Sequence, residues 1–180
     1  MIFAGLDIET TGTDPNRNHR LIQIGIVFPD RPEKIAHDVL PIGDINIQAE
    51  AMAINHFTLA RIGAAQPQTD VDNQIEALLT FYGYKENSIT PVGWNVGGFD
   101  MGFVKKELPK TAAFFSYRTL DLTALAIMHE LRSGYPYRDL KVKFAALIAQ
   151  QLGRDERHDA LYDAEAALVA MQLFKDLDME

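Results

Sequence analysis

The run from Ile2 to Ile8 constrains the fold most strongly, because largely apolar residues occupy both of its alternating faces. A strand with two apolar faces must be covered on both sides, so the run predicts a central strand of a layered sheet. Asp7 and Glu9 lie at i and i+2 and point to the same side, with about 6 to 7 Å between their Cα atoms. Like charges at this spacing repel unless a cation lies between them or one is protonated. A strand that frays into a solvated loop is the alternative explanation.

The rest of the chain predicts two more strands, followed by alternating strand and helices. "RLIQIGIVF" is rich in β-branched residues and bounded by turn residues, and "EKIAHDVLPI" follows it, so both form a meander with the first strand. A fourth strand is expected in "TPVGWN", before a Gly-Gly turn. Apolar residues at helical spacing predict helices over residues 70–82, 99–108, 118–131, 140–152 and 158–177. This order predicts one layered α/β domain over residues 1–180.

Composition narrows the classes of protein to which this chain can belong. With 180 residues, 47% of them apolar, it can bury one sizeable core. It has no cysteine, which excludes disulfides and thiolate metal sites and suits a cytoplasmic protein. No apolar run reaches the roughly 20 residues that span a bilayer, so no membrane association is expected. The 17 Lys and Arg against 25 Asp and Glu give a net charge of −8, which argues against a broad basic footprint for long duplex nucleic acid.

Two further segments carry acids beside predicted helix starts. Asp100 follows a Gly-Gly turn in "GWNVGGFDMGFV", where a carboxylate could simply complement the positive end of a helix. In "RHDALYDAEAAL", Asp159 and Asp163 are four residues apart and share a helix face, whereas His158 would lie about 140° from Asp163 on a helix. His158 can therefore approach Asp163 only from the loop before the helix. A first-turn acid, a surface His and a solvated helix face are the alternative.

Taken in order, "LDIETTG", "NVGGFDMGFV" and "HDALYDA" resemble the three motifs of the DEDDh (DnaQ-like) family of 3′ to 5′ exonucleases. The resemblance runs from Leu6 to about Leu168 and is more specific than any one motif. It implies a ribonuclease-H-like α/β fold with a central mixed β-sheet flanked by α-helices. It also implies that His158 is the general base and that two divalent metal ions, Mg²⁺ or Mn²⁺, are bound by Asp7, Glu9, Asp100 and Asp163.

These residue types suit the chemistry that the resemblance implies. Phosphodiester hydrolysis develops negative charge on the attacking and leaving oxygens, and two cations about 3.5 to 4 Å apart can stabilise both. Mg²⁺ and Mn²⁺ prefer hard oxygen ligands such as carboxylates. A histidine that titrates near neutral pH can take the proton of the attacking water.

The resemblance further implies substrate contacts at Thr10, Thr11, Gly12, Met52, Ile54, Asn95 and Phe99. Gly12 permits a backbone conformation that other residues resist. Apolar side chains of "AMAINHF", Phe57 among them, are candidates to wedge against the terminal bases, and Phe99 is a candidate to stack on one. Ordinary turn formation and core packing explain the same residues about as well.

We expect a metal-dependent exonuclease that releases nucleoside monophosphates from single-stranded 3′ ends of DNA or RNA. The segment with Tyr117, Arg118 and Asp121 resembles oligoribonucleases of the same family, and an acidic protein suits short RNA because few phosphates need to be contacted. The helix "AEAALVAMQLF" instead resembles proofreading relatives, so the subfamily stays open. A non-catalytic nucleic-acid-binding adaptor and a structural metal site are the alternatives from other classes. A homodimer is compatible with this interpretation, and no feature indicates a polymerase partner.

Overall fold

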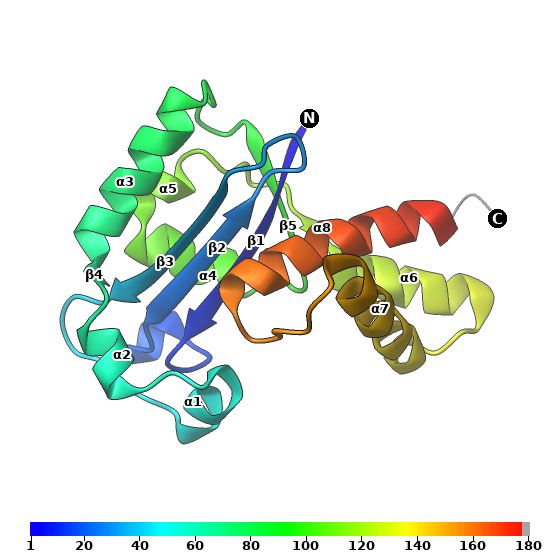
Figure 1. The fold of residues 1–180 in the computed structure, drawn as a ribbon, viewed down its shortest axis with the longest axis horizontal. Coiled ribbons are helices and arrows are strands. Elements are labelled where there is room, and N and C mark those ends of the chain that lie inside the picture. The colour runs from blue at the N-terminus through cyan, green and yellow to red at the C-terminus, as the bar shows by residue number, and fades with distance from the viewer. Residues whose placement is uncertain (178–180) are drawn as a thin grey trace.

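The computed structural model describes residues 1–177, and its centre is a six-stranded mixed sheet (Figure 1). In the order β4-β3-β2-β1-β5-β6, strands β1, β2 and β3 form an antiparallel meander, and the pairs β1–β5, β5–β6 and β3–β4 are parallel. The strands are β1 (Ile2–Thr10), β2 (Leu21–Val27), β3 (Lys34–Leu40), β4 (Gln66–Pro67), β5 (Ile89–Gly93) and β6 (Leu120–Asp121). The meander and the mixed α/β sheet predicted for this chain are therefore confirmed.

Helices cover both faces of the sheet (Figure 1). Leu6 and Ile8 of β1 pack in one core with α3 and α4, and Val92 of β5 packs in a second core with α6, α7 and α8. Within residues 1–177, no helix is both long and apolar enough to cross a membrane. The helices are α1 (Ala49–Asn55), α2 (Leu59–Gly63), α3 (Gln68–Phe81), α4 (Asp100–Glu107), α5 (Pro109–Ala112), α6 (Leu122–Ser133), α7 (Tyr137–Leu152) and α8 (Ala160–Leu177), with a 3₁₀ turn η1 (Pro15–Arg17).

Two glycines allow α8 to lie directly on the sheet. A Cβ atom at Gly5 of β1 would lie 2.0 Å from the carbonyl oxygen of Ala164, and one at Gly25 of β2 would lie 2.2 Å from that of Ala160. Any larger residue at either position would push the helix away. Because Gly25 pairs with Asp7 across the β1–β2 ladder, this close approach brings the start of α8 beside the first acid of β1.

The strand that carries the first two acids is longer than its sequence pattern indicates. β1 continues to Thr10, so Asp7 and Glu9 both lie within hydrogen-bonded strand rather than in a frayed loop. The short helices α1, α2 and α5 were not predicted. They are 7, 5 and 4 residues long, which is too short to show a helical period.

The segment between β5 and α6 also differs from the helix predicted over residues 118–131. Residues 120–121 form the edge strand β6, and α6 begins only at Leu122. Asp121 caps this helix, because its Oδ1 accepts a hydrogen bond from the backbone N–H of Thr123 (2.8 Å). Asp121 therefore lies at the start of α6 rather than inside a helix.

Candidate active site

Asp7 and Glu9 project from β1 toward α8. They share the face of Gly5, which contacts α8, and they alternate with the core residues Leu6 and Ile8 on the opposite face. Glu9 is only 8% exposed. The strand therefore holds two carboxylates on a rigid backbone, beneath the helix that carries the third motif.

Asp100 is the first residue of α4 and is 3% exposed. A tight turn precedes it, in which the N–H groups of Gly98 and Phe99 both donate to the carbonyl of Asn95 (3.1 and 2.9 Å). Asn95 has a φ of 60°, and its own N–H donates to Oδ1 of Asp121 (3.0 Å). The acid that caps α6 thus also holds the turn that carries Asp100, a second role that the sequence did not indicate.

His158 lies in the loop before α8, as helical geometry requires. Its backbone N–H donates to Oδ2 of Asp163 (2.8 Å), and its φ is 68°. The imidazole is exposed, whereas Asp163, in the first turn of α8, is half-buried. The left-handed residue therefore turns the chain so that a loop side chain lies beside a helix carboxylate.

Gln23 of β2 fastens the beginning of α8. Its Nε2 donates to Oδ2 of Asp159 (3.1 Å), and its Oε1 accepts from the N–H of Ala160 (2.9 Å). Oδ1 of Asp159 in turn accepts from the N–H groups of Leu161 (3.1 Å) and Tyr162 (3.2 Å), which caps the helix. Sequence reasoning did not identify Gln23, although a single amide in the otherwise apolar strand "LIQIGIV" is a usable signal.

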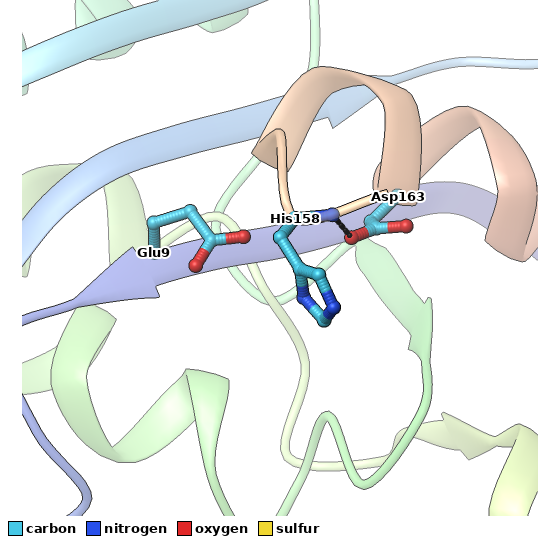
Figure 2. Close-up of side chains that lie close together, drawn as sticks. All are labelled: Glu9, His158 and Asp163. Atoms are coloured by element: carbon cyan, nitrogen blue, oxygen red, sulfur yellow. Dashed lines mark hydrogen bonds between the residues drawn. The ribbon is translucent and has the colours of Figure 1, made fainter. Parts of the chain in front are cut away.

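Side chains of β1 and of the start of α8 come together at one place (Figure 2). Glu9, His158 and Asp163 offer ligand atoms that all lie within 4.8 Å of one another. Figure 2 shows Glu9 on β1 opposite the loop and first turn that carry the other two. Two carboxylates and one imidazole at this spacing can surround a cation or a water molecule.

Burial raises the pKa of all four acids and is the largest cause for each of them. The pKa of Glu9 rises to about 8 and that of Asp100 to about 7. The pKa of Asp7 lies well above its usual value, because burial is followed by repulsion from Asp100 and Asp163. Hydrogen bonding from the His158 backbone offsets part of the rise for Asp163.

The donor set fits divalent cations. Among residues 1–177, none of the ion pairs involves Asp7, Glu9, Asp100 or Asp163, although the charge of Arg157 offsets part of the raised pKa of Asp163. Four hard oxygen donors that repel one another are the set that Mg²⁺ or Mn²⁺ binds. Divalent metal binding is therefore what the donor set and its electrostatics favour.

A pocket of about 300 Å³ adjoins the acids. Asp7, His158 and Asp163 line it on one side. Its apolar wall is formed by Trp94, Phe144, Ile148 and Tyr162. Lys141 lies at this wall, with its Nζ 5.2 Å from the centre of the Trp94 ring, and among the described residues it makes no ion pair. The pocket combines an apolar wall with a free cation beside the carboxylates.

The hydroxyl groups of Thr10 and Thr11 are occupied within the protein. Thr10 donates to the carbonyl of Gly12 (2.7 Å), and Thr11 donates to the carbonyl of Asn46 (2.7 Å). Gly12 does not have a positive φ, so the conformational reason given for it above is wrong. Space is the reason instead, because a Cβ at Gly12 would lie 2.6 Å from the ring of His19. Substrate contact by this segment stays a prediction.

The apolar candidates for base contact occupy different environments. Phe57 is a core residue, 5% exposed, and packs with Ile22, while Met52 is half-buried against the same cluster. Ile54 is 52% exposed. Phe99 is half-buried, with its ring 5.3 Å from that of Phe103. Ile54 is therefore the candidate in "AMAINHF" that is most accessible to a ligand.

Known proteins similar to this chain are exonucleases. The RNase T family model, described as "Exonuclease", matches residues 4–171. Oligoribonuclease of Paracidovorax citrulli is 26% identical over 175 residues, which is 92% of this chain and 83% of the relative. Oligoribonuclease of Vibrio cholerae is 20% identical over 178 residues, 94% of this chain and 91% of the relative.

Solved structures share the fold. E. coli Exonuclease I in complex with a dT13 oligonucleotide has a TM-score of 0.71 and 18% identity, over 97% of this chain and 41% of that chain. Exonuclease I from Methylocaldum szegediense has a TM-score of 0.73 and 20% identity, over 99% and 41%. The chain thus spans about two fifths of the Exonuclease I chains that it matches. The ribonuclease-H-like fold is confirmed, and the chain belongs to the RNase T exonuclease family, the DnaQ-like 3′ to 5′ exonucleases.

Proposed function

We propose that this protein removes nucleoside monophosphates from single-stranded 3′ ends, with two divalent ions held by Asp7, Glu9, Asp100 and Asp163. The observation that carries the proposal is the convergence of four acids from three separate segments, with raised pKa values and no ion pair within residues 1–177. When bound, two such ions supply stabilisation of the negative charge that develops on the attacking and leaving oxygens.

His158 is the proposed general base. Its exposed imidazole lies beside Glu9 and Asp163, within reach of a water molecule held between them. The hydrogen bond from its backbone to Asp163 fixes the loop, while the ring stays free to accept the proton of the attacking water.

The pocket beside the acids suits one nucleotide of the substrate. Its volume of about 300 Å³ is at the lower end for ligand pockets and suits one nucleotide better than several stacked bases. Trp94 and Phe144 provide apolar surface for a base, and Lys141 provides a cation for a phosphate. We expect Lys141→Met to raise KM more than it lowers kcat, because we assign this lysine to phosphate binding rather than to proton transfer.

Short RNA is the substrate that we favour. The relatives named above are oligoribonucleases that this chain matches over nearly its full length. A net charge of −8 also disfavours long strands, since affinity for them grows with the number of phosphates neutralised by Lys and Arg. Single-stranded DNA is the second candidate, because the fold is shared with an Exonuclease I that was solved with a dT13 oligonucleotide.

The test uses 5′-labelled DNA and RNA of one sequence, in long and very short versions, with Mg²⁺, with Mn²⁺ and with a chelator. We expect a metal-dependent ladder that shortens from the 3′ end, fastest on short RNA. Faster turnover of long DNA would reverse the substrate assignment but keep the enzyme. No degradation of any strand with either ion would instead support a nucleic-acid-binding adaptor.

The role of His158 is tested separately with His158→Ala. We expect kcat to fall by about 10²- to 10⁴-fold, the usual contribution of a general base, while calorimetric Mn²⁺ binding is retained. Loss of Mn²⁺ affinity would make His158 a metal ligand. Unchanged kcat would remove it from the mechanism.

A further inference from the structure

The carboxylate of Glu165, on α8, forms ion pairs with two basic side chains that come from different parts of the chain. The side chain is 9% exposed. Its Oε1 pairs with Nζ of Lys34 on β3, and its Oε2 pairs with the guanidinium of Arg154, in the loop between α7 and α8. The same guanidinium also pairs with Glu156 and lies 5.3 Å from the centre of the Tyr162 ring. Arg154 is thus tied to α8 by an ion pair and by an aromatic contact.

We propose that Arg154 and Glu165 are positioning residues that hold the loop of residues 153–159 so that the His158 imidazole faces Glu9 and Asp163. This inference rests on the proposed function, in which His158 is the general base. It assigns no contact with substrate to either member of the pair.

The course of the loop shows why an anchor is needed. The chain leaves α7 at Gly153 with a φ of 70° and reaches His158 with a φ of 68°. Between these two left-handed residues, the side chains at positions 155–157 are exposed, whereas Arg154 is half-buried. The far end of the loop is held by Asp159 through Gln23. Arg154 therefore ties the near end of the loop to α8 through Glu165 and Tyr162.

The placement of Glu165 on α8 separates this anchor from the carboxylate site. Two residues along a helix turn a side chain by about 200°, so Glu165 and Asp163 point in nearly opposite directions. Asp163 faces the acids of β1, and Glu165 faces Lys34 and Arg154. An effect of this pair on catalysis must then be transmitted through the loop.

Lys34 provides a matched control within the same cluster. Lys34 and Arg154 pair with the two oxygens of one carboxylate, but Lys34 belongs to β3, and its one ion pair among the described residues is to Glu165 rather than to the loop. Lys34→Met and Arg154→Met each leave Glu165 with one basic partner, so neither variant leaves the buried carboxylate without an ion pair. Both variants should fold, and they differ in whether the loop keeps its anchor.

The experiment measures kcat and KM on a short 5′-labelled RNA with Mg²⁺, together with Tm. Four single variants are compared with the wild type: Lys34→Met, Arg154→Met, Arg154→Lys and His158→Ala. The fifth variant is the double variant Arg154→Met/His158→Ala. Displacing a catalytic group by about 1 Å can cost about 10²-fold, so we expect Arg154→Met to lower kcat by about 10- to 100-fold with KM nearly unchanged. Arg154→Lys should recover most of that loss. Lys34→Met should stay within about twofold of the wild type, as for a pair remote from the reacting atoms.

The double variant separates positioning from general damage. If Arg154 acts through His158, adding Arg154→Met to His158→Ala lowers kcat no further, because interacting residues are not additive. A further fall in the double variant, or an equal loss in Lys34→Met, would overturn the proposal. So would an unchanged kcat in Arg154→Met. If His158→Ala itself keeps full activity, the proposed general-base role of His158 fails first, and the two failures are thereby distinguished.

Discussion

Asp72 and Asp100 are both nearly fully buried, at 5% and 3% exposed, but the surroundings of the two carboxylates are opposite in character. Asp72, on α3, accepts backbone hydrogen bonds from Lys110 (3.1 Å) and Thr111 (2.8 Å) in α5, one at each oxygen. Asp100 lies with other acids at the end of the sheet, and burial raises its pKa to about 7. The fold pairs Asp72 with two backbone donors, whereas the pKa of Asp100 stays raised despite the backbone hydrogen bonds that it accepts.

This difference teaches that burial alone does not distinguish a structural acid from a functional one. Asp72 joins α3 to α5, and its charge is spread over two N–H donors of a helix start. Backbone hydrogen bonds at Asp100 offset only part of the rise, and neighbouring acids add to it. A carboxylate in these surroundings lowers the stability of the fold until a cation binds to it. This is the behaviour expected of a metal ligand.

The largest expected effect comes from neutralising each acid in turn. Asp100→Asn should lower kcat by about 10³-fold or more, because it removes a ligand charge from the site that stabilises the transition state. Asp72→Asn should leave kcat per folded molecule unchanged. Both are measured on a short 5′-labelled RNA with saturating Mg²⁺, after the folded fraction of each variant is determined by circular dichroism.

The order of the two variants should be reversed for stability, with Asp72→Asn as the destabilised one. Asp72→Asn weakens two buried charge-assisted hydrogen bonds, so the free energy of unfolding should fall by about 1–3 kcal/mol. Asp100→Asn removes a repelling charge and should leave Tm in metal-free buffer at about pH 8 unchanged or higher. An Asp100→Asn protein that retains turnover, or that melts as early as Asp72→Asn, would mean that the two acids do not differ in kind.

The next largest expected effect is a fall in stability as pH rises, which bound metal should reverse. The raised values, about 7 for Asp100 and about 8 for Glu9, mean that the folded protein binds protons more tightly than the unfolded chain. Stability from these groups is fully present below their ordinary values near 4 and is lost as pH rises through 7 and 8. In metal-free buffer, Tm should therefore fall between about pH 6 and pH 8.5, by on the order of 10 °C.

Mg²⁺ should reverse this loss, because ligand carboxylates bind it in their ionised form. The gap between the Tm values with and without Mg²⁺ should widen as pH rises, and Asp100→Asn should flatten both curves. Differential scanning fluorimetry in a buffer series measures this directly. A constant gap from pH 6 to pH 8.5 would indicate that the four acids are not the groups that bind the ion.

Residues whose placement depends on local geometry could be predicted from the sequence. Strand alternation puts Asp7 and Glu9 on one face, and helical periodicity requires His158 to lie in a loop. The contacts that bring the segments together could not be predicted in the same way. Gln23 holds Asp159 from 136 positions away, and the lone amide in "LIQIGIV" indicates that Gln23 needs a partner but not which residue supplies it.

The region of α1 and α2 shows the limit of pattern reasoning on short elements. Phe57 and Ile54 are alternatives of equal merit in "AMAINHF", yet one is a core residue and the other is half exposed. Seven- and five-residue helices contain too few turns to define an apolar face. Which side chain is buried there depends on the packing of α1 and α2 against Ile22 of β2.

The smallest expected effect concerns Glu107 of α4, which lies between the two cases. It is 2% exposed, and one oxygen accepts from the N–H of Leu21 (3.3 Å), while the other has no hydrogen-bond partner. Burial raises its pKa to about 6. Because the folded value is raised, Glu107 contributes stability at about pH 4 that is lost as pH rises through 6, by about 2 kcal/mol at most.

Glu107→Gln cannot ionise, so it should escape this loss. The quantity to follow is the Tm difference, the Tm of the variant minus that of the wild type, in metal-free buffer. We expect this difference to rise by a few degrees between about pH 5 and pH 8, whether it is positive or negative at pH 5. Glu86→Gln, which changes an exposed acid outside the ion pairs of the described residues, is the control and should show no such trend. A difference that does not change with pH would mean that water reaches the unpartnered oxygen. Glu107 would then belong with Asp72, as an acid that the fold already satisfies, and buried repulsion would be confined to the carboxylates around β1.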